Sequence, residues 1–192
     1  DTCTQVWYAL SELGADRKSL LINIGGGVVT DLGGFVASTY MRGIPFINIP
    51  TSLLAMVDAS VGGKTGVDLG ALKNLVGVIN NPQGVVIYPD FLATLPTEEL
   101  RSGMAEMFKH GLISDEAYWH KMCNLSELTE AHLGSLIYES VVIKNKVVTQ
   151  DPTEKGLRKT LNYGHTLGHA IESYCLQNPN RERLLHGEAI AI

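Results

Sequence analysis

Two histidines stand four residues apart in the stretch LNYGHTLGHA, which covers residues 161–170. In a helix, residues at i and i+4 lie one turn apart on the same face. His165 and His169 would then point the same way, with Asn162 one turn below them. A glycine precedes each histidine and would let another group approach closely. The pattern predicts a metal or substrate role for at least one histidine, although a core or surface position is the ordinary alternative.

A carboxylate with mostly apolar neighbours occurs upstream, in the segment GMAEMFK at residues 103–109. On a helix, Glu106 and Lys109 would share a face, and an ordinary ion pair worth roughly a few tenths of a kcal/mol is the simplest role. Glu106 with His165 and His186 would instead form a three-ligand zinc set with a fourth position open. No spacing rule links Glu106 to the histidines, so both interpretations stay open.

Basic residues accompany these candidates. Arg158 lies four residues before Asn162, which lies three residues before His165. A continuous helix would bring them to one side, and Lys144 on the preceding helix would lie alongside. Cations next to a metal suit an anionic, oxygen-rich substrate, for which phosphate and carboxylate are the obvious groups.

The first half of the chain carries a glycine turn between a strand-like run at residues 20–24 and a helix-like segment at residues 28–37. Strand, glycine turn and helix together can bind phosphate through backbone N–H groups and the helix N-terminus. The nucleotide fingerprint GxGxxG is partly met, because Gly25 and Gly27 fit but Thr30 takes the third position. A plain tight turn is the alternative.

A second glycine-rich turn ends in GGKT at residues 62–65. It is similar to the tail of a P-loop, but that motif requires glycine where this chain has Asp58, so a nucleoside triphosphatase is disfavoured. Lys64 is a candidate for holding a phosphate as a point charge. Lys73 follows in what we expect to be another loop, and a solvated surface position is the alternative for both lysines.

Strands alternating with glycine turns and helices predict an α/β layer with a parallel sheet in the first half. The expected elements are helices at 3–13, 28–37 and 53–57, and strands at 20–24, 46–50 and 85–88. After Pro96 the periodicity is helical, with Thr97 as the expected N-cap. We therefore predict an α/β, Rossmann-like nucleotide-binding domain at residues 1–95 and an all-helical domain at residues 96–192.

Composition narrows the class of protein. The 192 residues are 45% hydrophobic and 18% charged with a net charge of −5, so a globular protein is indicated and neither nucleic acid nor a lipid surface is favoured as partner. No apolar segment reaches the length of about 18 residues that a membrane-spanning helix needs. The chain opens without a leader-like segment and has three widely spaced cysteines without a metal pattern, which favours the cytoplasm.

The motifs occur together, from end to end of the chain, in a pattern that resembles the 3-dehydroquinate synthase family. They read GGGVVTD, YMRG, VDASVGGKT, KNL, GMAE, LNYGHTLGHA and HGEA. Each is modest alone, and together they are highly specific. The resemblance implies a dehydroquinate synthase-like fold, with NAD and a divalent metal (zinc or cobalt) in the cleft between the two domains, and a cytoplasmic homodimer.

The resemblance also implies three groups of site residues. The metal ligands would be Glu106, His165 and His186. The NAD site would include Gly27, Val28, Val29, Thr30, Asp31, Thr51, Ser52, Lys64, Lys73, Phe91, Leu92, Ala93 and Thr94. The catalytic and substrate-binding residues would be Asp58, Lys64, Lys109, Lys144, Arg158, Asn162 and His169, with Arg42 reaching across a dimer interface.

The implied activity is that of a carbon–oxygen lyase acting on a phosphate ester. It converts 3-deoxy-D-arabino-heptulosonate 7-phosphate, a small sugar phosphate, to 3-dehydroquinate and phosphate in the shikimate pathway of aromatic amino-acid biosynthesis. In the family, NAD oxidises the C5 hydroxyl transiently, with zinc as Lewis acid. Phosphate leaves by β-elimination, the hydride returns, and an intramolecular aldol step closes the ring. No net oxidation results.

Three alternatives stay open. A sister sugar-phosphate cyclase of the valiolone or inosose synthase type is disfavoured, because Lys109, Lys144, Asn162 and His169 match the dehydroquinate pattern. A metal-dependent polyol dehydrogenase of the glycerol dehydrogenase type would release NADH as product. Because family chains are considerably longer, we expect a fragment lacking both ends and impaired in catalysis. A non-catalytic remnant or binding module is therefore the third alternative.

Overall fold

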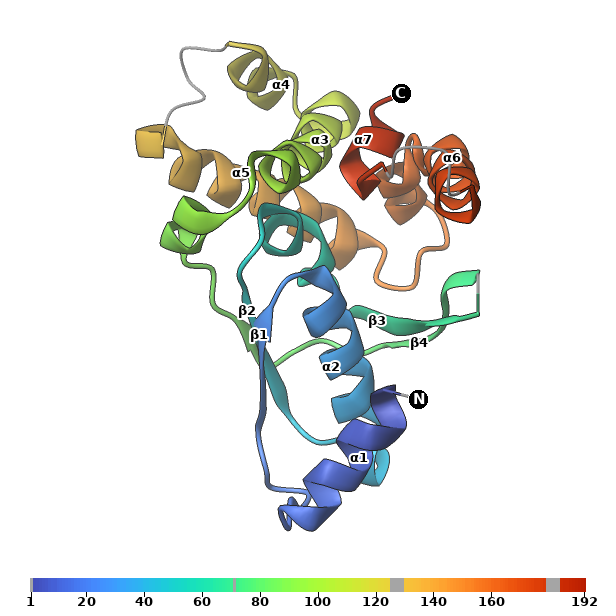
Figure 1. Cartoon of the computed structure of the whole chain (residues 1–192). Coiled ribbons are helices and arrows are strands. Elements are labelled where there is room, and N and C mark those ends of the chain that lie inside the picture. The colour runs from blue at the N-terminus through green and yellow to red at the C-terminus, as the bar shows by residue number, and fades with distance from the viewer. Residues whose placement is uncertain (1, 71, 125–129, 179–183) are drawn as a thin grey trace.

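The computed structural model describes residues 2–70, 72–124, 130–178 and 184–192. An α/β part is followed by a helical part, as the fold class predicted from the sequence requires (Figure 1). The elements of the α/β part are α1 (Thr2–Glu12), β1 (Leu21–Gly25), α2 (Gly27–Thr39), η1 (Tyr40–Arg42), β2 (Phe46–Pro50), η2 (Ala55–Ala59), β3 (Lys64–Leu69), β4 (Leu72–Ile79), β5 (Gly84–Val85) and η3 (Pro89–Thr94). Those of the helical part are α3 (Thr97–Ser114), α4 (Glu116–Cys123), α5 (Glu130–Gln150), η4 (Leu157–Asn162), α6 (His165–Gln177) and α7 (His186–Ile190).

The predicted parallel sheet has the strand order β1, β2, β5. Its strands are parallel because α2 carries the chain back between β1 and β2, and the buried side chain of Phe46 packs in the small core beneath them. The strand expected at residues 85–88 is too long, since β5 pairs with β2 only at Gly84 and Val85. The chain leaves the sheet before Pro89, which has no N–H to donate to a ladder.

An antiparallel hairpin of β3 and β4 replaces the loops expected around Lys64 and Lys73. Lys64 opens β3, and Lys73 belongs to β4, where its side chain lies outside the described part of the chain. Gly66 lies opposite Gly77, and a β-carbon on Gly77 would lie 2.4 Å from the backbone oxygen of Thr65. These glycines allow the two backbones to approach closely. They also interrupt the alternating side-chain pattern by which a strand is recognised in the sequence.

The short helix expected at residues 53–57 starts as an α-helical turn and continues as the π-helix η2. The side chains of Leu53, Met56 and Val57 are fully buried in the main hydrophobic core, which they share with α3 and α5. Such π-helical turns are frequent at functional sites. Here the turn brings Asp58 to the side chain of Lys144 on α5.

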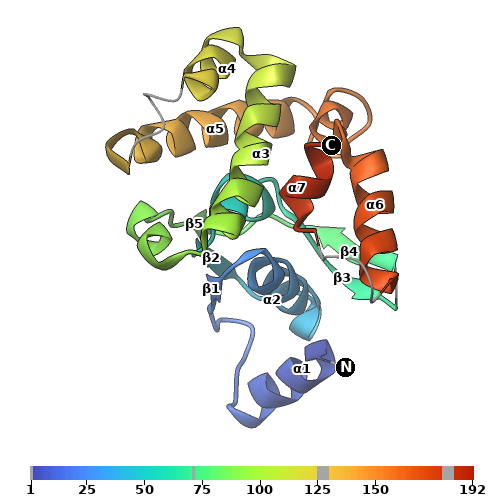
Figure 2. The same ribbon diagram turned by 45° about the horizontal axis from the view of Figure 1, so that its top comes forward.

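The helical part is built on α3, with α4 and α5 packed against it in the same core. The N-cap of α3 is Pro96, not Thr97 as expected from the sequence, because Pro96 has extended backbone angles (φ −54°, ψ 143°) and Thr97 is already helical. At the other end of this part, α7 packs against both α6 and α3 (Figure 2). Among the described residues, no helix is both long and apolar enough to cross a membrane.

The helix expected to run through Arg158, Asn162 and His165 is broken. The 3₁₀-helix η4 ends at Asn162, and Gly164 adopts a φ of 79° before α6 starts at His165. Glycine takes this left-handed conformation at little cost. A β-carbon on Gly164 would also lie 2.9 Å from the backbone oxygen of Ile190 in α7. Asn162 therefore reaches the site from a separate turn and not from one helical turn below His165.

Candidate functional site

A cavity of about 670 Å³ lies where the α/β part, the hairpin and the helical part meet. Its volume suits a small-molecule ligand. Many residues that the sequence singles out line it, and they come from segments far apart in the chain. They are Gly27, Val28, Asp31, Asp58, Lys64, Lys144, Arg158, Asn162, His165, His169 and His186.

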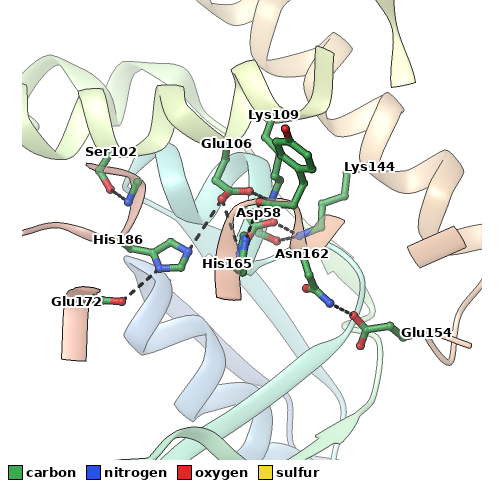
Figure 3. Close-up of polar contacts among 12 residues, drawn as sticks. Asp58, Ser102, Glu106, Lys109, Lys144, Glu154, Asn162, His165, Glu172 and His186 are labelled. Carbon is green, nitrogen blue, oxygen red and sulfur yellow. Dashed lines mark hydrogen bonds and ion pairs between the residues drawn. The ribbon is translucent and has the colours of Figure 1, made fainter. Parts of the chain in front are cut away.

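Side chains from three helices converge where His165 and His186 line this cavity (Figure 3). The Oε1 atom of Glu106 on α3 lies 3.9 Å from Nε2 of His165 on α6 and 4.0 Å from Nε2 of His186 on α7. In a tetrahedral zinc site with ligand bonds of about 2.0–2.1 Å, ligand atoms lie roughly 3.3 Å apart. The two distances from Glu106 Oε1 exceed that spacing by less than about 1 Å.

The protonation of these groups fits a metal. Burial lowers the pKa of His165 to about 4, aided by the charge of Lys109, so its imidazole is neutral at neutral pH and has a free nitrogen lone pair. Burial raises the pKa of Glu106 to about 7, aided by the charge of Asp58. The Glu106 Oε1 atom is buried without a hydrogen-bond partner among the described residues. A bound cation would satisfy that oxygen.

A second possible ligand set consists of His165, His169 and His186, whose ring nitrogens lie within 4.8 Å of one another. It shares two members with the first set, so the difference lies between His169 and Glu106. The Glu106 side chain is fully buried, and burial of an ionised carboxylate is costly unless a cation compensates it. Lys109 already pairs with Glu106 Oε2, so the unsatisfied atom is Oε1, which faces both His165 and His186. Glu106 therefore remains the third ligand that we propose, and His169 lines the cavity.

Buried cations surround the carboxylates of the site. Lys109 forms an ion pair with Glu106, and its Nζ lies on the shared face of α3 expected from the spacing. Lys144 donates to the backbone oxygen and to Oδ1 of Asp58, both at 2.5 Å. Although burial alone would raise the pKa of Asp58, Lys144 and Lys109 hold it well below the usual range. Asp58 is therefore ionised at neutral pH.

Arg158 and Lys64 both line the cavity, from different parts of the chain. The Arg158 guanidinium is 2% exposed and donates to the backbone oxygens of Pro152 at 2.9 Å and Gly62 at 2.7 Å. Glu154 connects the hairpin to η4, since its carboxylate lies 2.5 Å from Lys64 Nζ and accepts from Asn162 Nδ2 at 2.7 Å.

The residues expected around NAD divide into two groups. Gly27, Val28 and Asp31 line the cavity at the start of α2, where helix N–H groups can meet a phosphate. Burial raises the pKa of Asp31 to about 7, aided by repulsion from Asp58. Lys64, also expected at NAD, lines the cavity from β3. The remaining described members, and Arg42 on η1, are not part of the cavity lining: Val29, Thr30, Thr51, Ser52, Phe91, Leu92, Ala93 and Thr94.

Two residues near the site were missed from the sequence. His110, buried on α3, lies with its Nδ1 2.8 Å from Ser140 Oγ, and burial lowers its pKa to about 3. His110 follows Glu106 by four residues, a spacing that could have placed both side chains on one face of α3. Glu172 on α6 lies with Oε2 3.6 Å from Nδ1 of His186. It follows His165 by two helical turns, a spacing that would have put it on the same face.

Solved structures define the class of this fold. A 2-epi-5-epi-valiolone synthase from Streptomyces hygroscopicus, with NAD+ and Zn2+ bound, matches with a TM-score of 0.86 and 34% identity, over 98% of this chain and 53% of that chain. A 2-deoxy-scyllo-inosose synthase complexed with carbaglucose-6-phosphate, NAD+ and Co2+ matches with a TM-score of 0.85 and 31% identity, over 98% and 51%. The fold is therefore that of the sugar-phosphate cyclases.

Sequence comparison then identifies the family within this class. The family model for the 3-dehydroquinate synthase N-terminal part matches residues 1–102, and the C-terminal model matches residues 103–192. The 3-dehydroquinate synthase of Parabacteroides distasonis is 51% identical over 189 residues, which are 97% of this chain and 53% of that protein. The chain belongs to the 3-dehydroquinate synthase family, as the motifs predicted. It spans about half the length of the curated relatives it matches.

Proposed function

We propose that the protein carrying this chain is a 3-dehydroquinate synthase, a lyase that converts 3-deoxy-D-arabino-heptulosonate 7-phosphate to 3-dehydroquinate and phosphate. One observation carries the proposal: the Glu106, His165 and His186 set lies beside a cavity that also has Lys144 and Arg158 in its wall. A metal set supports chemistry at a substrate oxygen, and the cations support binding of a carboxylate and a phosphate.

The chain's own residues would bind and orient the substrate. Arg158 is fixed by two backbone oxygens, so its planar guanidinium would meet an anion without a large loss of side-chain freedom. Lys144, which also lines the cavity, is held by Asp58. Placing a flexible open-chain sugar phosphate between such fixed groups brings its reacting atoms together, and orientation of this kind can be worth several kcal/mol.

Two bound groups would supply the rest of the chemistry. When bound, NAD supplies a temporary hydride acceptor, and a divalent metal supplies a Lewis acid at the oxidised oxygen. The ligand set suits zinc or cobalt, and Gly27, Val28 and Asp31 at the start of α2 are the cavity residues that would face NAD. The solved valiolone and inosose synthases carry NAD+ with Zn2+ or Co2+, which supports the same pair of groups here.

The alternatives fit less well. The sister cyclases are 34% and 31% identical to this chain, whereas dehydroquinate synthases reach 51%, and the substrate residues of the helical part match the dehydroquinate pattern. A polyol dehydrogenase acts on an uncharged polyol, which gives no use for buried Lys109, Lys144 and Arg158. A cytoplasmic homodimer with Arg42 at its interface stays a prediction; Arg42 is exposed on η1 and thus accessible to a partner.

The deciding assay uses the whole protein that carries this chain, with the heptulosonate phosphate, NAD+ and zinc. Phosphate release and absorbance at 340 nm are followed together. We expect phosphate to appear without net NADH. Steady accumulation of NADH without phosphate would point to a dehydrogenase, and phosphate release only from a different sugar phosphate would point to a sister cyclase.

A further inference from the structure

A buried acid on α6 has no part in the function proposed so far. Glu172 is 6% exposed and lies behind His186, on the side away from Glu106 (Figure 3). A carboxylate in such a position is unfavourable unless a hydrogen-bond donor or a cation faces it. The ring of His186 is the candidate donor: its Nδ1 lies 3.6 Å from Glu172 Oε2, a few tenths of an ångström beyond a normal hydrogen bond.

The two nitrogens of His186 therefore face different partners. Nδ1 faces the carboxylate of Glu172, while Nε2 faces the carboxylate of Glu106 at 4.0 Å. A neutral imidazole carries one N–H and one lone pair. With the N–H on Nδ1 directed at Glu172, the lone pair is on Nε2 and points to the place where the ligand set converges.

His165 has the same arrangement with a different acceptor. Its Nδ1 lies 3.2 Å from the backbone oxygen of Tyr163, and its Nε2 lies 3.9 Å from the same Glu106 oxygen. Both histidines thus direct Nε2 inward and hold Nδ1 against an oxygen. For His165 the oxygen belongs to the turn before α6, and for His186 it belongs to a side chain that can be replaced.

We propose that Glu172 is the positioning residue of His186: it accepts a hydrogen bond from Nδ1 and so fixes the tautomer and the ring orientation in which Nε2 binds metal. This inference rests on the proposed metal site. Acceptors behind metal-bound histidines commonly change metal affinity by about 10–100-fold when they are removed. Glu172 is thus assigned a positioning role and is not one of the three proposed ligands.

Two variants of the whole protein distinguish the effect of losing the hydrogen-bond acceptor from the effect of changing the side-chain packing. Glu172→Met removes the acceptor, keeps a similar volume and takes a charge out of the interior, so it is expected to fold. Glu172→Gln keeps an acceptor oxygen. Zinc affinity is measured by competition with a chromophoric chelator. The tautomer of His186 is read from its ring ¹⁵N shifts in the metal-free protein.

We expect zinc to bind about 10–100-fold more weakly to the Met variant and the loss to be smaller in the Gln variant. In the Met variant, the tautomer of His186 that carries its proton on Nδ1 should be less populated. Glu116→Gln is the matched control, because Glu116 faces His120 at 3.7 Å on an exposed surface and carries the same charge. Its zinc affinity should equal that of the unaltered protein.

Two results would overturn the inference while the metal site stands: a Met variant that binds zinc as tightly as the unaltered protein, or equal losses in both variants with an unchanged tautomer. If the unaltered protein binds no zinc, the metal site itself is wrong, and the role of Glu172 is wrong with it. Each outcome therefore separates the inference from the function on which it rests.

Discussion

At the scale of single residues, the site is characterised by which buried carboxylate oxygens have a partner and which do not. Lys109 faces Glu106, Lys144 faces Asp58, and the Glu106 Oε1 atom lacks a hydrogen-bond partner among the described residues. That oxygen, with two neutral imidazoles within 4.0 Å, is what a cation would complete. Single substitutions can therefore test the ligand set directly.

The first prediction concerns the identity of the ligands. Glu106→Gln, His165→Ala and His186→Ala should each lose bound zinc, because each removes one of three protein ligands. His169→Ala should keep it. Metal content is measured after dialysis against buffer, with His120→Ala, a replacement of an exposed histidine, as control. Zinc retained by the Glu106 variant and lost by the His169 variant would establish the three-histidine set instead.

The second prediction concerns Asp31, whose pKa is raised from 3.8 to about 7 by burial and by the charge of Asp58. The folded chain holds a proton there that the unfolded chain has already released. The free energy of unfolding therefore falls as the pH rises from about 4 to about 7, and it levels off above that range. A shift of this size corresponds to at most about 4 kcal/mol, reduced because solvent reaches the half-buried group.

Asp31→Asn should remove this fall. The variant should exceed the unaltered protein in stability at pH 8, with the difference disappearing toward pH 4, as measured by urea unfolding at several pH values. Glu116→Gln changes charge at an exposed site and should leave the pH dependence as it is. Identical pH dependence in the Asn variant would contradict the burial of an acid at this position.

At the scale of elements, the position of His186 depends on how α7 lies on α3. The backbone N–H of Gly187 donates to Ser102 Oγ at 2.9 Å, and a β-carbon on Gly187 would lie 2.0 Å from the backbone oxygen of Ser102. The two backbones touch there without room for a side chain. The distance from Glu106 to His186 is thus set by a glycine contact and not by either ligand.

The third prediction follows from that contact. Gly187→Ala should force α7 away from α3, lower the free energy of unfolding by about 1–3 kcal/mol and weaken zinc binding. Gly156→Ala is the matched control, since a β-carbon there would meet nothing within 4 Å. Chemical unfolding and zinc titration of both variants provide the measurement. Unchanged zinc affinity in the Gly187 variant would mean that α7 does not fix its histidine.

Helices and strands whose hydrophobic side chains recur at a regular helical or strand spacing could be predicted from the sequence, as β2 and α3 illustrate. The hairpin was not, because Gly66 and Gly77 act through the approach of two backbones, which leaves no side-chain pattern. The break at Gly164 was missed because motif spacing alone does not report backbone angles. Glu106 could be suspected as a ligand, but only the packing of α3 on α7 brings it to the histidines.

At the scale of the whole molecule, the cavity joins the two parts of the chain. Its wall takes Asp31 and Lys64 from the α/β part and Arg158 and the histidines from the helical part. Lys144 on α5 contacts Asp58 on η2, so this ion pair also connects the two parts. A ligand bound there contacts both parts and stabilises their arrangement.

The fourth prediction concerns the whole chain's response to metal. A ligand that binds only the folded state at 100 times its Kd stabilises it by about 2.7 kcal/mol, which raises Tm by several degrees. Zinc should raise Tm, and a chelator should reverse the effect. The His186→Ala variant should show little response. A Tm that is independent of zinc in the unaltered protein would contradict a site spread over three helices.

The contact between Gly187 and Ser102 also has a consequence for the order of folding. The two residues lie 85 positions apart in the chain, and the third ligand lies on the last described helix. A nascent chain that has folded only as far as α6 presents Glu106 and His165 without His186. In the proposed ligand set, tight metal binding would therefore follow the emergence and docking of α7, so the ion would stabilise helices that have already packed and would not initiate their folding.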